Sequence, residues 1–299
     1  LNDAGARVLI FGAEHADTVA AIRERLPTVK HFILITRNSS TSASFGCHAY
    51  EALRESASSE EPGVSVDEQD LHTLFYTSGT TGKPKGVMLT QKSWSNVVIN
   101  LALDYGPIET EDILLNTQLL SHGAGFFVLP FFIFGATNML MARADPQSIF
   151  ETIQREKVTV LKLVPSILYQ LMQFPTKTQY DLSSLKTIIY GGSPIAVPRL
   201  VEALQFFGPK LVQLYGQAEV PMCISFLGKK DHVWEGPAEA LQRLQSAGKP
   251  CTNVEVRVVD DEGRDQPIET VGEVIVRGDH RFSGYWNKPQ ETAETLHDC

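Results

Sequence analysis

The residues best suited to chemistry lie between positions 76 and 90, where the chain reads YTSGTTGKPKGVMLT directly after an apolar run. Glycines let the backbone approach a ligand closely, while hydroxyls and lysines supply hydrogen-bond donors and positive charge. The candidate contacts are Thr77, Ser78, Gly79, Thr80, Thr81, Gly82, Lys83 and Lys85. Such a loop is built to wrap phosphate oxygens. A solvated turn is the alternative for a bare GTTG, but the length of the motif favours phosphate binding.

This loop is not a Walker A motif, which would need Gly at position 77 and Ser or Thr at position 84. The chain has Thr77 and Pro84 there.

Two further motifs follow predicted strands. GGSP at 191–194 follows LKTIIY, and YGQAE at 215–219 follows KLVQLY. Ligands of open α/β sheets bind outside the carboxyl ends of the strands, so we expect both motifs to face one crevice. Taken alone, GGSP could be an ordinary turn, and a single Glu or Tyr there could be surface or core.

Together these motifs resemble the signatures of the adenylate-forming (AMP-binding) enzyme superfamily, and more specifically its acyl-CoA synthetase branch. GKP at 248–250, GE and VRG within 272–278, and GYWNKPQET at 284–292 follow in the family's order, so the resemblance covers the whole chain. It implies that a carboxylic acid attacks the α-phosphorus of ATP to give an acyl-adenylate and pyrophosphate, after which coenzyme A displaces AMP. A regulatory homologue without turnover and an adenylation domain that does not use coenzyme A are the alternatives; luciferase-like oxidation is less favoured.

The resemblance also assigns roles to residues. Lys85 and Glu219 would be catalytic, and Glu219 would hold Mg²⁺ beside the phosphates. The nucleotide would contact the loop residues named above together with Gly191, Gly192, Ser193, Pro194, Tyr215, Gly216, Gln217 and Glu219. At Ala218 the family most often has Thr, so the chain lacks one expected hydroxyl near the phosphates.

A histidine-containing segment, LLSHGAGFF at 119–127, resembles the family's acyl-pocket border. It implies that His122, Gly123 and Phe126, together with Gly191, contact the acid, with His122 as a wall or gate residue. A lone histidine near an apolar helix is also often purely structural. Residues 113–144 contain no Asp or Glu to receive a substrate ammonium, which argues against amino-acid activation.

Apolar side chains instead suggest an apolar acid, whether fatty, alicyclic or aryl; these are Phe126, Phe127, Ile167 and Met222. Hydrolase chemistry is excluded at Ser193, because GGSPI lacks the second glycine of a nucleophile elbow.

Strands alternate with helices from residue 71 to 215, which predicts parallel sheets covered on both faces. After residue 225, two alternating strands around the turn DDEGR predict an antiparallel pair. We therefore expect an α/β fold with two layered parallel-sheet subdomains, 1–117 and 118–225, and part of a small antiparallel β-barrel-like subdomain, 226–299. The resemblance further implies an incomplete first subdomain and a missing C-terminal catalytic domain, so that these residues alone would be inactive.

Composition sets the remaining limits. The 299 residues carry a formal net charge of -9 and are 43% hydrophobic, which allows a packed core and disfavours nucleic-acid binding by bulk charge. Four cysteines without a CxxC pair indicate a reducing cytoplasm. The uncharged run 113–142 is long enough to span a bilayer, but its polar residues, Gly and Pro favour a buried helix followed by a buried strand. Oligomeric state stays open.

Overall fold

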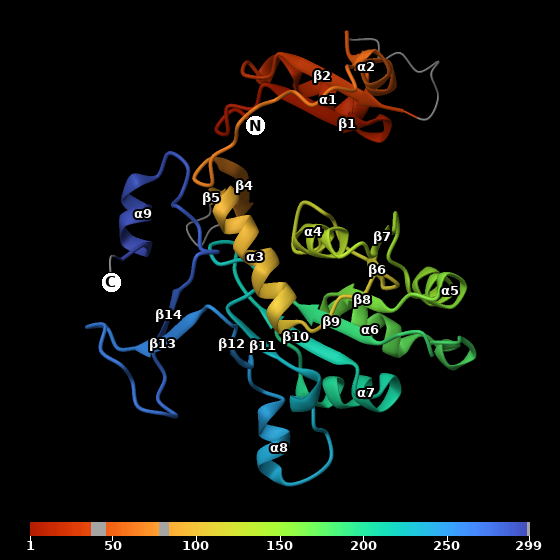
Figure 1. The fold of residues 1–299 in the computed structure, drawn as a ribbon, viewed down its shortest axis with the longest axis vertical. Helices are drawn as coiled ribbons and strands as arrows, with labels where there is room; N and C mark the ends of the chain where they lie inside the picture. The colour runs from red at the N-terminus through yellow and green to blue at the C-terminus, as the bar shows by residue number, and fades with distance from the viewer. Residues whose placement is uncertain (37–45, 78–83, 298–299) are drawn as a thin grey trace. The chain divides into compact units, whose positions relative to one another are not determined.

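The computed structural model describes residues 1–36, 46–77 and 84–297 (Figure 1). The chain divides into two compact units, residues 1–67 and 68–299. The mixed α/β class with parallel sheets, expected from the alternating pattern, is confirmed.

The first unit is built on a parallel three-stranded sheet in the order β1–β2–β3, with β1 at Val8–Gly12, β2 at His31–Ile35 and β3 at His48–Ala49. Helix α1 spans Ala16–Ile22 between two short 3₁₀ turns, and α2 spans Tyr50–Ser56. Its small core contains Phe11, Val19, Leu26, Val29, Phe32 and Leu34.

The second unit is organised by a seven-stranded sheet in the order β12–β11–β10–β9–β8–β6–β7. The parallel strands are β6 (Ile113–Asn116), β7 (Thr137–Leu140), β8 (Val160–Leu163), β9 (Thr187–Gly191) and β10 (Leu211–Tyr215). Strands β11 (Ser225–Leu227) and β12 (Lys249–Pro250) add to one edge in antiparallel orientation. Every residue of β8 and β9 is buried, as expected for strands covered on both faces.

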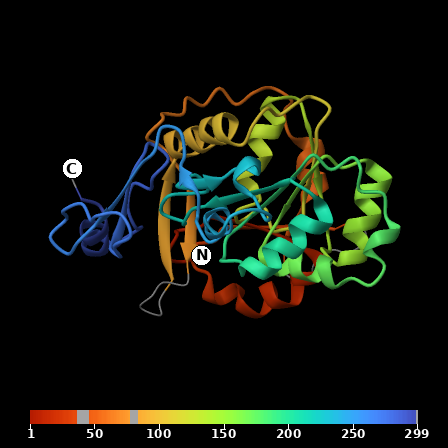
Figure 2. The same cartoon turned by 90° about the horizontal axis from the view of Figure 1, so that it is seen from below.

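Helices cover the two faces of this sheet in separate layers. Helices α5 (Pro146–Glu156), α6 (Pro165–Gln173) and α7 (Val197–Phe207) bury their apolar stripes in one core, and α3 (Gln91–Asp104) and α4 (Gly125–Ile133) in the other. In Figure 2 the sheet lies between α3, drawn in gold, and helices α5 to α7, drawn in green to cyan. Alternate residues of one strand serve opposite cores, since Leu161 packs toward α5 and Val160 toward α4.

Two antiparallel pairs complete the second unit. Strand β4 (Leu71–Thr77) pairs with β5 (Lys85–Thr90), and β13 (Glu255–Val259) pairs with β14 (Glu273–Arg277). The second pair was expected from its alternation. Strand β5 was not expected, because the glycine-rich loop was predicted to lead directly into a helix. Thr90 instead ends β5 and caps α3 through a reciprocal box with Ser93. Short helices α8 (Ala238–Arg243) and α9 (Pro289–Thr295) follow.

The large sheet crosses the subdomain limits expected at residues 117 and 225. Strand β6 lies before the first limit and β12 beyond the second, yet both pair in the same sheet. The physical reason is that β6 lies between β7 and β8 and pairs with both. The sheet, rather than these limits, is therefore the frame of the site.

The uncharged run 113–142 contains β6, α4 and β7. Helix α4 has only nine residues, and no helix of the described residues is long and apolar enough to cross a membrane. The expectation of a buried helix and a buried strand holds only in part. Phe132 of α4 is 73% exposed, and β7 is half-buried because it forms an edge of the sheet.

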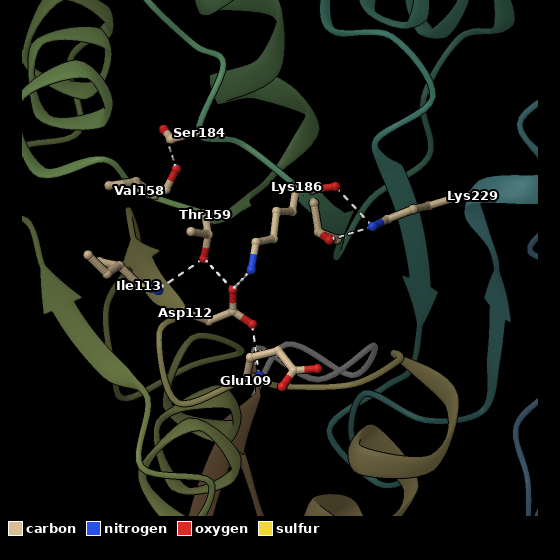
Figure 3. Close-up of polar contacts among 9 residues, drawn as sticks. Glu109, Asp112, Ile113, Val158, Thr159, Ser184, Lys186 and Lys229 are labelled. Carbon is tan, nitrogen blue, oxygen red and sulfur yellow. Dashed lines mark hydrogen bonds and ion pairs between the residues drawn. The ribbon is translucent and has the colours of Figure 1, made fainter.

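A polar cluster closes the amino edge of the central strands (Figure 3). Buried Asp112 accepts hydrogen bonds from the Thr159 hydroxyl at 2.8 Å, the Lys186 ammonium at 2.8 Å and the Glu109 backbone N–H at 2.9 Å. Burial works to raise the pKa of Asp112, but these hydrogen bonds outweigh it and hold the pKa below its usual value. The cluster lies just before β6, β8 and β9 begin, so its role is to fix the strands.

Candidate nucleotide and acid site

The predicted phosphate loop is only partly within the described residues. Ser78, Gly79, Thr80, Thr81, Gly82 and Lys83 lie outside them. Thr77 ends β4, Lys85 begins β5, and these two residues are register partners across the antiparallel pair. Phosphate binding by the loop stays a prediction.

Tyr285 joins the two predicted catalytic residues. Its hydroxyl donates a 2.7 Å hydrogen bond to Oε1 of Glu219, and Nζ of Lys85 lies 5.0 Å from its ring centroid. A lysine at that distance from an aromatic ring gains a cation–π attraction. Burial, reinforced by the hydrogen bond to Glu219, raises the pKa of Tyr285 to about 12, so at neutral pH the hydroxyl keeps its proton. Sequence reasoning used GYW only as a signature and missed this residue.

Tyr285 is positioned by a segment that runs antiparallel beside β5. The Met88 N–H donates to the Gly284 carbonyl at 2.9 Å, and the Trp286 N–H donates to the Gly86 carbonyl at 2.8 Å. Two glycines permit this approach. A Cβ on Gly86 would lie 3.1 Å from the Tyr76 ring, and one on Gly284, which has φ of 135°, would lie 2.7 Å from Thr292.

Glu219 lies in a tight turn after β10. Gly216 packs so closely on the Met222 backbone that an added Cβ would collide with the Met222 N atom. The turn is closed by a 3.1 Å hydrogen bond from the N–H of exposed Gln217 to the Val220 carbonyl. The Ile224 N–H donates a 3.0 Å hydrogen bond to the Tyr215 carbonyl. Phe282 N–H then donates to the Glu219 carbonyl at 2.7 Å. Half-buried Glu219 is therefore held at the carboxyl end of β10, as predicted.

Ala218, where a hydroxyl was expected, packs against the core beneath α4.

GGSP emerges one strand away. Gly191 ends β9 as the register partner of Leu214, and a Cβ there would collide with the Leu214 carbonyl oxygen. Gly192 has φ of 87°, and Ser193 and Pro194 are exposed after it. The preceding Tyr190 fixes the strand end from the core, because its hydroxyl bonds Gln213 at 2.9 Å and His232 at 3.0 Å. GGSP and YGQAE thus share the carboxyl edge of the sheet.

The histidine segment meets the Glu219 turn. A Cβ on Gly123 would lie 3.2 Å from the Met222 Cε. His122 is exposed, sits edge-on to the Phe75 ring at 5.4 Å and shares a 3.0 Å hydrogen bond with the Ser121 hydroxyl. Phe126 is 3% exposed and stacks on Trp94 at 4.4 Å, which makes it a core residue. Contact of these residues with an acid stays a prediction.

Ile167 does not join the apolar residues with which it was grouped. It packs in the core of α5–α7, whereas Phe126, Phe127 and Met222 pack on the opposite face of the sheet.

Mg²⁺ commonly binds through one or two carboxylates together with phosphate oxygens and water. The described residues contain no group of three or more His, Cys, Asp or Glu that could hold a metal. A single half-buried carboxylate, with Oε1 oriented by Tyr285, fits an ion whose other ligands come from a nucleotide.

A family model for AMP-binding enzymes matches residues 1–286. The chain belongs to the AMP-binding enzyme family. It is 41% identical over 226 residues to a medium/long-chain-fatty-acid–CoA ligase of Mycobacterium tuberculosis, which covers 75% of this chain and 38% of that protein. It is 31% identical to a feruloyl-CoA synthase of Amycolatopsis over 100% of this chain. It is 34% identical to an indoleacetate–CoA ligase of Aromatoleum aromaticum over 85% of this chain.

The fold of this chain is also similar to that of solved structures. An amide bond synthetase of Marinactinospora thermotolerans has a TM-score of 0.82 at 30% identity, covering 98% of this AMP-binding chain and 56% of that one. The N-terminal domain of FACL13 from Mycobacterium tuberculosis has a TM-score of 0.81 at 27% identity, covering 99% of this chain and 69% of that one. The chain spans about half the length of the curated relatives it matches, with 55% and 48% of the feruloyl and indoleacetate enzymes covered.

Proposed function

We propose that the protein activates a carboxylic acid with ATP through an acyl-adenylate and transfers the acyl group to coenzyme A. The observation that carries this proposal is the Glu219–Tyr285–Lys85 arrangement at the carboxyl edge of the sheet. It brings an oriented carboxylate and an ammonium to either side of one tyrosine, next to the strand that carries GGSP. Membership of the AMP-binding family supports the use of ATP.

The chemistry asks the protein to bring two anions together and to stabilise charge that develops on phosphate. The Lys85 ammonium supplies positive charge where β5 begins, beside the predicted phosphate loop. Glu219 is the residue that would hold Mg²⁺, and Tyr285 orients its carboxylate by donating a hydrogen bond to Oε1. Mg²⁺, when bound there, supplies neutralisation of the phosphate charge. Binding acid and nucleotide in line contributes much of the remaining acceleration.

The acid is expected to have a largely apolar body. The curated relatives are named for fatty, feruloyl and indoleacetate substrates, and Phe126 and Phe127 are buried where the histidine segment leads into α4. Because one structural neighbour is an amide bond synthetase, the second half-reaction must be tested with amines as well as with coenzyme A. A cytoplasmic location is proposed from the free thiols Cys47, Cys223 and Cys251.

The decisive experiment is acid-dependent exchange of pyrophosphate into ATP, measured on the full-length protein with a panel of acids and Mg²⁺. We expect exchange with at least one acid, and AMP release only when coenzyme A is added. Exchange without any acid, or with none of a broad panel, contradicts the proposal and favours a binding homologue. Turnover with amines but not with coenzyme A corrects the acceptor alone.

A further inference from the structure

A lysine is buried at the carboxyl edge of the sheet, in a part of the site to which no role has been given. Lys162 is the third of four residues in β8 and is only 4% exposed. Its ammonium donates to Oε1 of Gln118 at 3.1 Å and to the Leu163 carbonyl at 3.2 Å, and it lies 5.7 Å from the Phe127 ring centroid. All of these neighbours are neutral.

Within the part of the chain that the structure describes, the ammonium therefore lacks a countercharge. None of the ion pairs formed by the described residues includes Lys162. Burial lowers the pKa of Lys162 to about 8, so the amine still carries its proton at neutral pH for most of the time. An ammonium has three donors, of which two are used, and a buried charge without a partner is costly.

A second unsatisfied side chain lies beside it. Asn116 of β6 is the register partner of Lys162 in the parallel pair and is 1% exposed. Neither Oδ1 nor Nδ2 of Asn116 has a hydrogen-bond partner among the described residues. Register partners on neighbouring strands project to the same face of a sheet. Because buried amides are nearly always hydrogen-bonded, this pair indicates a place where a ligand's polar group is bound.

The position of the pair ties it to the acid rather than to the nucleotide. Lys162 and Asn116 lie at the carboxyl ends of β8 and β6, and β8 adjoins β9, which ends at Gly191. The face they share is covered by α4, since Lys162 lies near Phe127. That helix begins within the histidine segment proposed to border the acid.

We propose that Lys162, with Asn116 and Gln118, binds an oxygen acceptor on the acid substrate, remote from the carboxylate that is activated. Preferred acids then carry a hydroxyl, carbonyl or second carboxylate on an otherwise apolar body. This inference rests on the proposed function. It refines the apolar class of acid that the apolar side chains near the histidine segment suggested, because a buried ammonium favours an oxygen acceptor on the substrate. Gln118 is half-buried, so a substrate oxygen can replace its Oε1 on the ammonium.

The test compares matched acids on the full-length protein by pyrophosphate exchange. Pairs of equal length are used, such as a straight-chain acid with its ω-hydroxy and dicarboxylic counterparts, and cinnamate with 4-hydroxycinnamate. We expect the wild type to favour the oxygenated member at least tenfold in kcat/KM. Lys162→Met keeps an unbranched side chain, and it should reduce the ratio of kcat/KM between the oxygenated and the plain acid at least tenfold. Lys177→Met, in the turn after α6 on the opposite face, is the matched control.

The outcomes separate the two proposals. No exchange by the wild type with any acid rejects the proposed function itself. Exchange with equal preference for both members of every pair rejects the role of Lys162, and this result needs no variant and so does not depend on how Lys162→Met folds. A wild-type preference that survives in a folded Lys162→Met protein also rejects it.

Discussion

Removing the Tyr285 hydroxyl tests the arrangement on which the proposed function depends. Tyr285→Phe deletes the donor to Glu219 Oε1 at 2.7 Å and keeps the ring 5.0 Å from the Lys85 ammonium. A hydrogen bond to a charged acceptor contributes about 1.5–3 kcal/mol, and because Glu219 is only half-buried we take the lower half of that range, about 1.5–2 kcal/mol. That corresponds to a decrease of about 10- to 30-fold in adenylation.

The assay is pyrophosphate exchange across a Mg²⁺ titration with saturating acid. Because the carboxylate loses its orientation and not its charge, the Mg²⁺ concentration for half-maximal rate should rise and part of the loss should recover at high Mg²⁺. Tyr180→Phe is the matched control, since Tyr180 stacks on Phe150 in the core of α5–α7, away from Glu219. An unchanged rate and an unchanged Mg²⁺ titration in folded Tyr285→Phe would refute the reasoning.

Three further predictions follow from the same contacts. Lys85→Ala should weaken ATP use about 10- to 100-fold whichever acid is supplied. The control Lys92→Ala removes only a surface ion pair and should have little effect. A loss in ATP kinetics that appears with some acids and not with others would contradict the prediction. Glu219→Gln keeps size and removes charge, so the Mg²⁺ requirement should rise and adenylation should slow, and an unaltered titration removes Glu219 from the metal. Asp112→Asn should lower the free energy of unfolding by about 1–3 kcal/mol at pH 7 in denaturant titrations. The pKa of Asp112 is lowered in the fold, so the stability that its carboxylate contributes is present above the unfolded pKa of about 3.9 and is lost as pH falls through the folded pKa. A difference in unfolding free energy between wild type and Asp112→Asn that does not shrink below about pH 4 argues against this role.

The part of the site that could be predicted from the sequence consists of motifs that each directly follow one strand. GGSP and YGQAE directly follow apolar runs that become β9 and β10, so their place at the carboxyl edge follows from parallel pairing. The Glu219 and Lys85 assignments came from the resemblance, and the structure brings both residues to Tyr285.

The parts that could not be predicted depend on contacts between distant segments. Strand β5 was missed because its short run follows a glycine-rich loop, and its pairing is completed by residues near 285 as well as by β4. Tyr285 and Glu219 are 66 positions apart, and no local pattern announces their hydrogen bond. In VTVLKL, Lys162 was interpreted only as part of a strand, and its burial depends on the α4 layer above it.

The two ends of the same strands show how stability and function are divided in this sheet. At the amino ends of β6 and β8, Asp112 and Thr159 complete each other's hydrogen bonds with help from Lys186, so that burial there is matched by partners. At the carboxyl ends, Asn116 has no partner among the described residues and Lys162 has only neutral ones. If polar burial served only to fix the strands, both ends would be satisfied in the same way. The difference indicates that the partners of the carboxyl ends come from a ligand, and it places that ligand on the α4 face of the sheet.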